Sequence, residues 1–163
     1  MPAAVLLPLR LHHDAIHVVF TRRSSDLSAH PGQVAFPGGR LDPSDASPTA
    51  AALREAYEEL AIPPERVQVL GRLDDFSTVT DYHVVPIVGL VEAGVTLVPQ
   101  PREVVYVFDV PLEKLLDAAG WEQRLHAYQN KRVPVWHFVH GQEDIWGVTG
   151  QILHGFVELL WGV

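Results

Sequence analysis

The chain contains no cysteine among its 163 residues. This absence excludes a disulfide framework, a thiol nucleophile and a cysteine-based zinc site. No window is long and apolar enough for a membrane span. The N-terminal apolar run at residues 3–9 is shorter than a secretory signal, contains Pro8 and follows no basic segment. We therefore expect a soluble, cytoplasmic protein.

Positive charge is also scarce: the chain has 12 Lys and Arg but 20 Asp and Glu, which gives a formal net charge of -8. This balance argues against general affinity for nucleic acid or for anionic membranes, so phosphate recognition requires individual arginines or a metal. Hydrophobic residues make up 47% of the chain, and no repeat or linker divides it. A single domain over residues 1–163 with a sizeable core is expected.

The most informative stretch covers residues 38–62, with the sequence GGRLDPSDASPTAAALREAYEELAI. Ser47 is a good N-cap, Pro48 suits the first helical position and Pro63 prevents continuation, which predicts a helix over residues 48–60. At about 100° per residue this helix has two different sides. The side expected to pack on the core carries Leu53, Ala56, Tyr57 and Leu60, and the opposite side carries Glu55, Glu58 and Glu59.

The three glutamates repel one another, at roughly 0.2 to 0.5 kcal/mol per pair spaced i,i+3 or i,i+4. Only Arg54 lies close enough in sequence to compensate, and a divalent cation would remove the repulsion. Oxygen ligands without cysteine favour a hard ion, Mg2+ or Mn2+. Just upstream, Gly38 and Gly39 permit close backbone approach, and the Gly39 carbonyl is a further candidate ligand. The alternative is a solvated acidic helix face that binds nothing.

The same stretch resembles the Nudix box, a motif of pyrophosphate hydrolases. Residues 54–62 match its second half, Arg-Glu-apolar-x-Glu-Glu-x-Gly-apolar, except that Ala61 stands where the family usually has Gly. The first half is one residue longer than usual, so Asp45 is the acid nearest to the usual upstream Glu. The resemblance implies the Nudix fold, an α/β (α+β) domain in which a mixed β-sheet is sandwiched between α-helices.

The segment before the box, TRRSSDLSAHPGQVAFPGG at residues 21–39, is similar to the signature of the coenzyme A pyrophosphatase branch of the Nudix hydrolases. That branch also carries the longer box. The matching positions are Arg23, Ser24, Leu27, His30, Gly32, Gln33, Val34, Phe36, Pro37, Gly38 and Gly39. The resemblance implies metal-dependent hydrolysis of coenzyme A, or of its oxidised or acyl derivatives, to 3',5'-ADP and 4'-phosphopantetheine.

Several residues are candidates to bind this substrate. Arg22 or Arg23 could neutralise the pyrophosphate or the ribose 3'-phosphate, although neighbours on a strand point in opposite directions. His30 could donate to a phosphate, stack on the substrate or fix the loop. The loop at residues 74–81 is expected to face the substrate, by resemblance to the family.

A catalytic hypothesis follows for the helix. Glu55 and Glu59, one turn apart, hold the ion, and Glu58 is a further ligand or a base-like partner. Arg54 is expected to orient the carboxylates. Glu103, an acid before a run of β-formers, is a candidate further metal ligand or proton acceptor, a position common in Nudix proteins.

The remaining pattern predicts alternating strands and helices. His137 and His140 would face opposite ways on a strand, so no zinc site is expected. Glu143 and Asp144, in a predicted turn at residues 141–144, are further candidate acids. Strands are expected at residues 3–9, 16–20, 33–36, 67–73, 83–91, 104–108 and 131–139, and helices at residues 111–118 and 149–161.

Two other functions remain open. A Nudix pyrophosphatase could act instead on ADP-ribose, dinucleotides or nucleoside triphosphates, and a Nudix domain without catalysis could bind a nucleotide or a partner protein. The expected partner is a small molecule, with no nucleic acid and no membrane. Exposed strand edges would also permit a homodimer.

Overall fold

A computed structural model describes all residues 1–163. Its main sheet is mixed and has the strand order β3-β2-β1-β7-β5, with β4 pairing with β1, β6 with β7 and β8 with β2. β1 and β7 run parallel, and the other neighbours in this sheet are antiparallel. The strands are β1 (Pro2–His12), β2 (Ala15–Arg23), β3 (Val34–Ala35), β4 (Gly38–Arg40), β5 (Val67–Arg72), β6 (Phe76–Ser77), β7 (His83–Val91) and β8 (Val104–Pro111).

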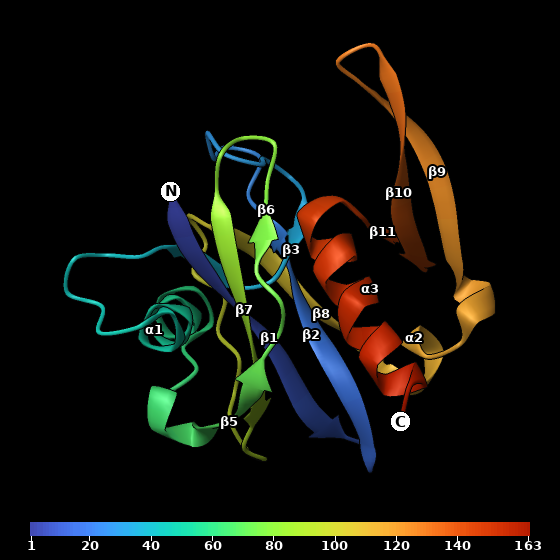
Figure 1. Ribbon diagram of the computed structural model, residues 1–163. Coiled ribbons are helices and arrows are strands. Elements are labelled where there is room, and N and C mark those ends of the chain that lie inside the picture. The colour runs from blue at the N-terminus through green and yellow to red at the C-terminus, as the bar shows by residue number, and fades with distance from the viewer.

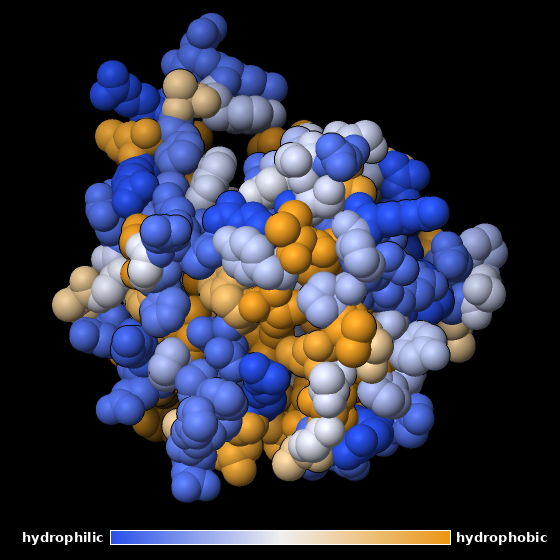
Figure 2. Space-filling view, turned by 180° about the vertical axis from the view of Figure 1, so that it is seen from behind, coloured by the Kyte–Doolittle hydropathy of each residue, from blue (hydrophilic) through white to orange (hydrophobic).

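A second, smaller sheet has the order β11-β10-β9. It consists of β9 (Trp121–Tyr128), β10 (Lys131–His140) and β11 (Glu143–Ile145). The helices are α1 (Pro48–Leu60), the single turn α2 (Leu112–Leu115) and α3 (Gly147–Trp161), with short 3-10 turns at Pro64–Arg66 and Ala118–Gly120. In Figure 1 the β9–β10 hairpin rises beyond the main sheet, and in Figure 2 its end stands clear of the rounded body.

The main sheet lies between two helices, as the resemblance implied, with α1 on one face and α3 on the other (Figure 1). Alternation along β1 divides the core, since Ala4 and Leu6 join the layer under α1 while Leu7 and Leu9 join the layer under α3. The layer under α3 is the larger and contains most of the aromatic side chains. No helix is long and apolar enough to cross a membrane.

Most of the predicted elements are confirmed. The helix at residues 48–60 has the predicted bounds, and the Ser47 side chain caps it by accepting from the Ala50 backbone N–H at 3.1 Å. β7 is buried on both faces along most of its length. The helix predicted at residues 111–118 is only the turn α2, and the strand β9 is absent from the prediction because few of its residues are buried.

The predicted orientation of α1 was wrong in part. Tyr57, expected on the core, is 56% exposed, whereas Glu59, expected in the acidic patch, is 4% exposed. The buried side of the helix is built mainly of small residues, which lets the helix lie close to the sheet. It comprises Ala51, Ala52, Ala56, Glu59 and Leu60.

Candidate active site

An acidic cluster forms where α1 meets the start of β8. One carboxylate oxygen each from Glu55, Glu59 and Glu103 lies within 4.8 Å of the others. Glu55 and Glu59 are one turn apart on the helix, and Glu103 comes from the turn directly before Val104. Three hard oxygen donors at this spacing can share one divalent cation.

Glu59 is the most deeply buried member of the cluster. Its Oε2 accepts a hydrogen bond from the Gly38 backbone N–H at 3.0 Å, and no Lys or Arg side chain forms an ion pair with it. Burial, with the nearby charge of Glu55, raises the pKa of Glu59 to about 8. Burial also raises the pKa of Glu55, and Glu58 and Glu103 add to that rise. Of the three carboxylates only Glu55 forms an ion pair, with Arg54 at 3.2 Å, and the remaining charge fits a bound divalent cation.

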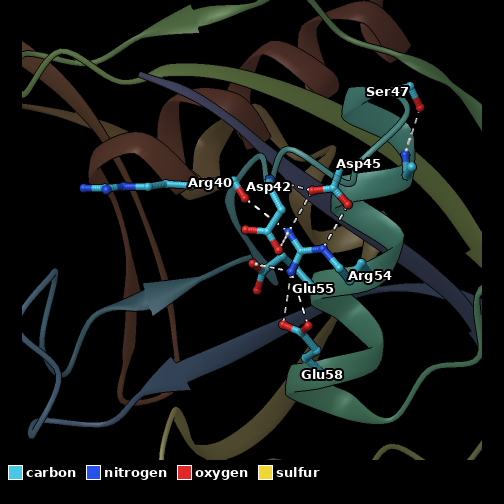
Figure 3. Close-up of polar contacts among 8 residues, drawn as sticks. Arg40, Asp42, Asp45, Ser47, Arg54, Glu55 and Glu58 are labelled. Atoms are coloured by element: carbon cyan, nitrogen blue, oxygen red, sulfur yellow. Dashed lines mark hydrogen bonds and ion pairs between the residues drawn. The ribbon is translucent and has the colours of Figure 1, made fainter.

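Glu58 is not a member of this cluster. Its side chain is 50% exposed and its carboxylate pairs with Arg54 at 3.2 Å. Arg54 lies at the centre of an acidic ring formed by Asp42, Asp45, Glu55 and Glu58 (Figure 3). This guanidinium holds Glu55, Glu58 and the preceding loop in one arrangement.

Asp45 has a positioning role in that ring. Its carboxylate accepts from Arg54 Nε at 3.0 Å and from Nη2 at 2.9 Å, and also from the Asp42 backbone N–H at 2.8 Å. The hydrogen bond from Arg54 lowers the pKa of Asp45. Asp45 is absent from the acidic cluster, so the lengthened box places this acid behind the site, where it anchors Arg54.

The two glycines beside the cluster are required by close packing. A Cβ on Gly39 would lie 2.6 Å from a Glu55 carboxylate oxygen, and one on Gly38 would lie 2.5 Å from the Ala4 carbonyl oxygen. In the pairing of β1 with β4, Gly39 lies opposite Ala4. Two backbone hydrogen bonds flank this pair, one from the Leu6 N–H to the Pro37 carbonyl and one from the Leu41 N–H to the Pro2 carbonyl. Along an antiparallel strand, the N–H and C=O groups of successive residues point alternately toward the partner strand and away from it. The N–H and C=O of Gly39 therefore point toward β1, and those of Gly38 point away from β1, toward α1. Gly38, rather than Gly39, thus has its carbonyl on the side of the carboxylates.

A cleft of about 430 Å³ opens beside Gly38 and Gly39. Two candidate substrate-binding residues, Arg23 and His30, line it, together with Thr78 and Val79 from the loop at residues 74–81. Another cleft, of about 630 Å³, lies between α3 and the segment around β6. None of the three clustered acids lines either cleft, but only the smaller one is lined by Gly38 and Gly39, which lie against Glu59 and Glu55. The smaller cleft is therefore the candidate substrate site.

The two adjacent arginines have different surroundings. Arg22 pairs with Glu143, donates to Tyr106 Oη and to the Gly32 carbonyl, and does not line the cleft. Arg23 lines the cleft and donates only to the backbone carbonyls of Ala29 and His30. Arg23 is therefore the arginine available to an anionic ligand, while Arg22 fixes the chain.

The two acids predicted in a turn instead occupy the strand β11. Glu143 pairs with Arg22 and Tyr106, and Asp144 accepts from His137 and Arg124. These partners hold both carboxylates in the small sheet. The expectation that both acids lie in a turn was wrong, because β10 pairs with β11 through Glu143 and Asp144.

Among the cleft residues that the sequence prediction did not name, Arg40, Tyr82 and Trp146 have the largest side chains. Arg40 Nη2 donates to Tyr82 Oη at 2.9 Å, with the guanidinium 5.5 Å from the ring centroid, and both residues line the cleft. Trp146 lines it from the small sheet. A single sequence contains no signal that joins these distant positions, since each reads alone as an ordinary surface residue.

Comparison with known proteins gives a consistent result. Residues 1–148 match the family model described as the NUDIX domain. The chain is 43% identical to the "Uncharacterized Nudix hydrolase NudL" of Photorhabdus laumondii over 96% of the chain and 83% of that protein. It is 41% identical to the protein of the same name from Pectobacterium atrosepticum, over 93% of the chain and 79% of that protein.

Solved structures share the fold. A C. elegans Ap4A hydrolase binary complex matches with a TM-score of 0.62 at 18% identity, over 99% of this chain and 98% of that one. The M. smegmatis Nudix hydrolase RenU matches with a TM-score of 0.58 at 24% identity, over 71% of this chain and 73% of that one. At these identities the similarity concerns the fold alone.

Proposed function

The chain belongs to the Nudix hydrolase family, whose members act on pyrophosphate bonds, and from that premise we propose that it hydrolyses coenzyme A or its oxidised or acyl derivatives. The products would be 3',5'-ADP and 4'-phosphopantetheine. One observation carries the proposal: positions that match the coenzyme A signature line the cleft beside the acidic cluster. These positions are Arg23, His30, Gln33, Val34, Phe36, Gly38 and Gly39.

Nudix hydrolases generally need divalent metal ions, and we propose Mg2+ or Mn2+ at the acidic cluster. Glu55, Glu59 and Glu103 would be the carboxylate ligands, with the Gly38 carbonyl facing the same side. When bound, the ion neutralises charge and polarises a phosphoryl oxygen for attack by water. The donor set suits a hard cation, because it contains only oxygen.

The protein's own groups supply orientation and proton transfer in this proposal. Arg23 neutralises a phosphate of the substrate, and Arg54 keeps Glu55 and Glu58 in place from behind. Glu58 lies outside the cluster but beside Glu55, with which it shares Arg54 Nη1, and we propose that it accepts the proton of the attacking water.

The decisive experiment compares substrates side by side. Coenzyme A, ADP-ribose, NADH and diadenosine polyphosphate would each be incubated with Mg2+, with Mn2+ and with EDTA, and the products separated by chromatography. We expect metal-dependent release of 3',5'-ADP from coenzyme A at the highest rate. Faster cleavage of ADP-ribose or a dinucleotide would favour the other pyrophosphatase function, and no turnover of any substrate would favour a binding domain without catalysis.

The substitution Glu55→Gln tests the metal model within this function. It keeps the shape of the side chain but removes a carboxylate from the cluster, so turnover at saturating Mg2+ should fall on the order of 100-fold or more. Glu113→Gln, at an exposed position of α2, is a matched control that should retain full activity. Unchanged turnover in Glu55→Gln would contradict the assignment of the cluster.

A further inference from the structure

Trp146, directly after the small sheet, lines the candidate substrate cleft and packs against two histidines of that sheet. His126 on β9, His137 on β10 and Trp146 after β11 are in mutual contact, and Trp146 lines the cleft. The small sheet and the loops around residues 24–33 and 78–82 lie at the same end of the main sheet (Figure 1). The cleft itself is lined by Trp146 and the start of α3, directly after β11, and by residues of those loops.

The two histidines form one flat unit. Their Nε2 atoms are 2.9 Å apart while their ring centroids are 5.1 Å apart, and the ring planes differ by 21°. These values place the imidazoles edge to edge, joined by a hydrogen bond, rather than one above the other. Asp144 accepts from His137 Nδ1 at 2.9 Å, which leaves the His137 Nε2 to accept from His126.

Trp146 stacks over this pair. Its indole lies 5.2 Å from the His126 ring at an interplanar angle of 26°, and 5.5 Å from the His137 ring at 8°. His137 is buried, 3% exposed, whereas Trp146 remains 38% exposed. The indole is thus supported from one side by two nearly parallel rings, and its remaining exposed surface belongs to the cleft.

Two further features indicate that this indole is not placed for folding alone. Trp146 occupies the N-cap of α3 and makes no capping hydrogen bond, although Ser, Thr, Asp or Asn there would stabilise the helix by about 1 kcal/mol. The indole N–H groups of Trp121 and Trp161 donate to backbone carbonyls, at 2.9 and 2.7 Å, while those of Trp136 and Trp146 form no hydrogen bond; of these two, only Trp146 lines the cleft. Its ring and its N–H are both available to a ligand.

We propose that Trp146 is the stacking platform for the purine base of the substrate, held flat by the hydrogen-bonded pair of His126 and His137. This inference rests on the proposed function for the identity of the nucleotide, adenine in coenzyme A. The cleft supplies what such a ligand needs, namely apolar side chains such as Val79 and Val148 around the ring and Arg23 for a phosphate. Asp144 is a positioning residue, because it orients His137 and does not reach the cleft.

The test measures binding of fragments without any turnover. The affinities of wild type and Trp146→Ala for 3',5'-ADP, AMP and 4'-phosphopantetheine would be compared by calorimetry. Loss of one stacked base weakens binding by roughly 5-fold to 100-fold, so both adenine nucleotides should bind the variant at least 5-fold more weakly. The base-free fragment 4'-phosphopantetheine should be unaffected. If Trp146→Ala weakened the binding of all three ligands equally, or of none of them, the proposed stacking role of Trp146 would be wrong.

Companion variants separate stacking from a folding defect. Trp146→Phe keeps a flat ring and should retain most of the affinity, whereas Trp161→Phe changes a similarly exposed indole outside the cleft and should bind as wild type. Adenine nucleotides should also quench tryptophan fluorescence in wild type and Trp161→Phe but not in Trp146→Phe. Quenching that persists in Trp146→Phe would contradict the proposal.

The same assays separate this proposal from the proposed function. If coenzyme A is not cleaved but the AMP affinity depends on Trp146, the platform stands and the substrate assignment fails. If coenzyme A is cleaved but Trp146→Ala binds 3',5'-ADP normally, the platform fails and the substrate assignment stands.

Discussion

Glu59 places a carboxylate where the helix meets the apolar layer beneath it. It is buried, receives one hydrogen bond from Gly38, and has Glu55 and Glu103 close by. Its pKa of about 8 means that the free protein holds a proton on Glu59 that an unfolded chain would release near pH 4.5. This residue therefore opposes stability in the absence of metal.

Glu59→Gln should stabilise the metal-free protein while abolishing metal binding. The amide retains an oxygen acceptor for the Gly38 N–H and removes the buried charge, so the free energy of unfolding at pH 8 to 9 should rise on the order of 1 to 3 kcal/mol. Urea denaturation in EDTA measures this, and Mn2+ binding by calorimetry measures the loss. Glu58→Gln, at the exposed position nearby, should change stability little. A destabilised Glu59→Gln protein would contradict the burial argument.

Metal affinity should depend on pH through the same carboxylate. Since the folded pKa of Glu59 lies above the unfolded value, the metal-free protein loses stability as pH rises from about 4.5 to about 8. Binding of the ion requires the charged form, so the association constant should rise about tenfold per pH unit below pH 8 and level off above it. Calorimetric Mg2+ or Mn2+ titrations at pH 6, 7, 8 and 9 measure this, and a flat profile would refute it.

The helix α1 ends in a conformation that suits glycine better than alanine. Ala61 adopts φ 58° and ψ 32°, its N–H bonds the Tyr57 carbonyl, and the Ile62 N–H bonds the Ala56 carbonyl. This is a left-handed C-terminal cap, in which a Cβ is strained. The chain therefore keeps the family's exit turn despite having Ala where the box usually has Gly.

Ala61→Gly should raise stability by about 0.5 to 1 kcal/mol, because it relieves this strain. The midpoint of urea unfolding gives the change, and hydrolytic activity should be retained since Ala61 is not in the acidic cluster. Ala50→Gly, the same chemical change inside the helix, should instead destabilise by about 1 kcal/mol. A loss of stability in Ala61→Gly would show that the left-handed cap is not strained.

The elements were predicted from sequence with uneven success, for identifiable reasons. The capping signals of Ser47 and Pro48 defined the start of α1, and the long apolar run of β7 defined a buried strand. Which side of α1 faces the sheet was less predictable. Hydropathy favours a buried Tyr57 and an exposed Glu59, whereas the structure has the reverse. A charged residue is buried there against its own preference, as is expected at functional sites.

The residues of the candidate site were predicted from sequence mainly where several of them lie in one continuous segment. Glu55 and Glu59 follow from helix periodicity, and Glu103 was a candidate that the fold brings to them. The strand β9 has little apolar alternation, so neither it nor His126 was anticipated. The assembly of Arg40, Tyr82 and Trp146 around one cleft depends on the tertiary fold, which local pattern does not encode.

At the scale of the whole molecule, Arg22 joins the main sheet to the small one. It lies on β2, its guanidinium pairs with Glu143 on β11, and Tyr106 on β8 bonds the same carboxylate. Both charged side chains are largely buried, at 29% and 13% exposed. This contact fixes the segment that contains Trp146 relative to Arg23, the neighbour of Arg22 on β2.

A double-mutant cycle tests that connection. Arg22→Met, Glu143→Gln and the double variant should give a coupling free energy of about 1 kcal/mol in the unfolding equilibrium. Tryptophan fluorescence is a suitable probe, because all four tryptophans lie in or next to the small sheet or in α3. Strictly additive single effects would show that the pair contributes nothing to holding the two sheets together.

The alanines under α1 have a consequence for how this enzyme tolerates mutation. Ala52 and Ala56 are fully buried between the helix and the sheet, so their size sets the height of Glu55 and Glu59 above β1. A larger apolar residue there could be absorbed by a small outward shift of the helix, yet that shift would separate these carboxylates from Glu103. Variants with larger residues at these positions should fold and express but lose catalytic activity. The small size of Ala52 and Ala56 is therefore required for the position of the carboxylates rather than for folding.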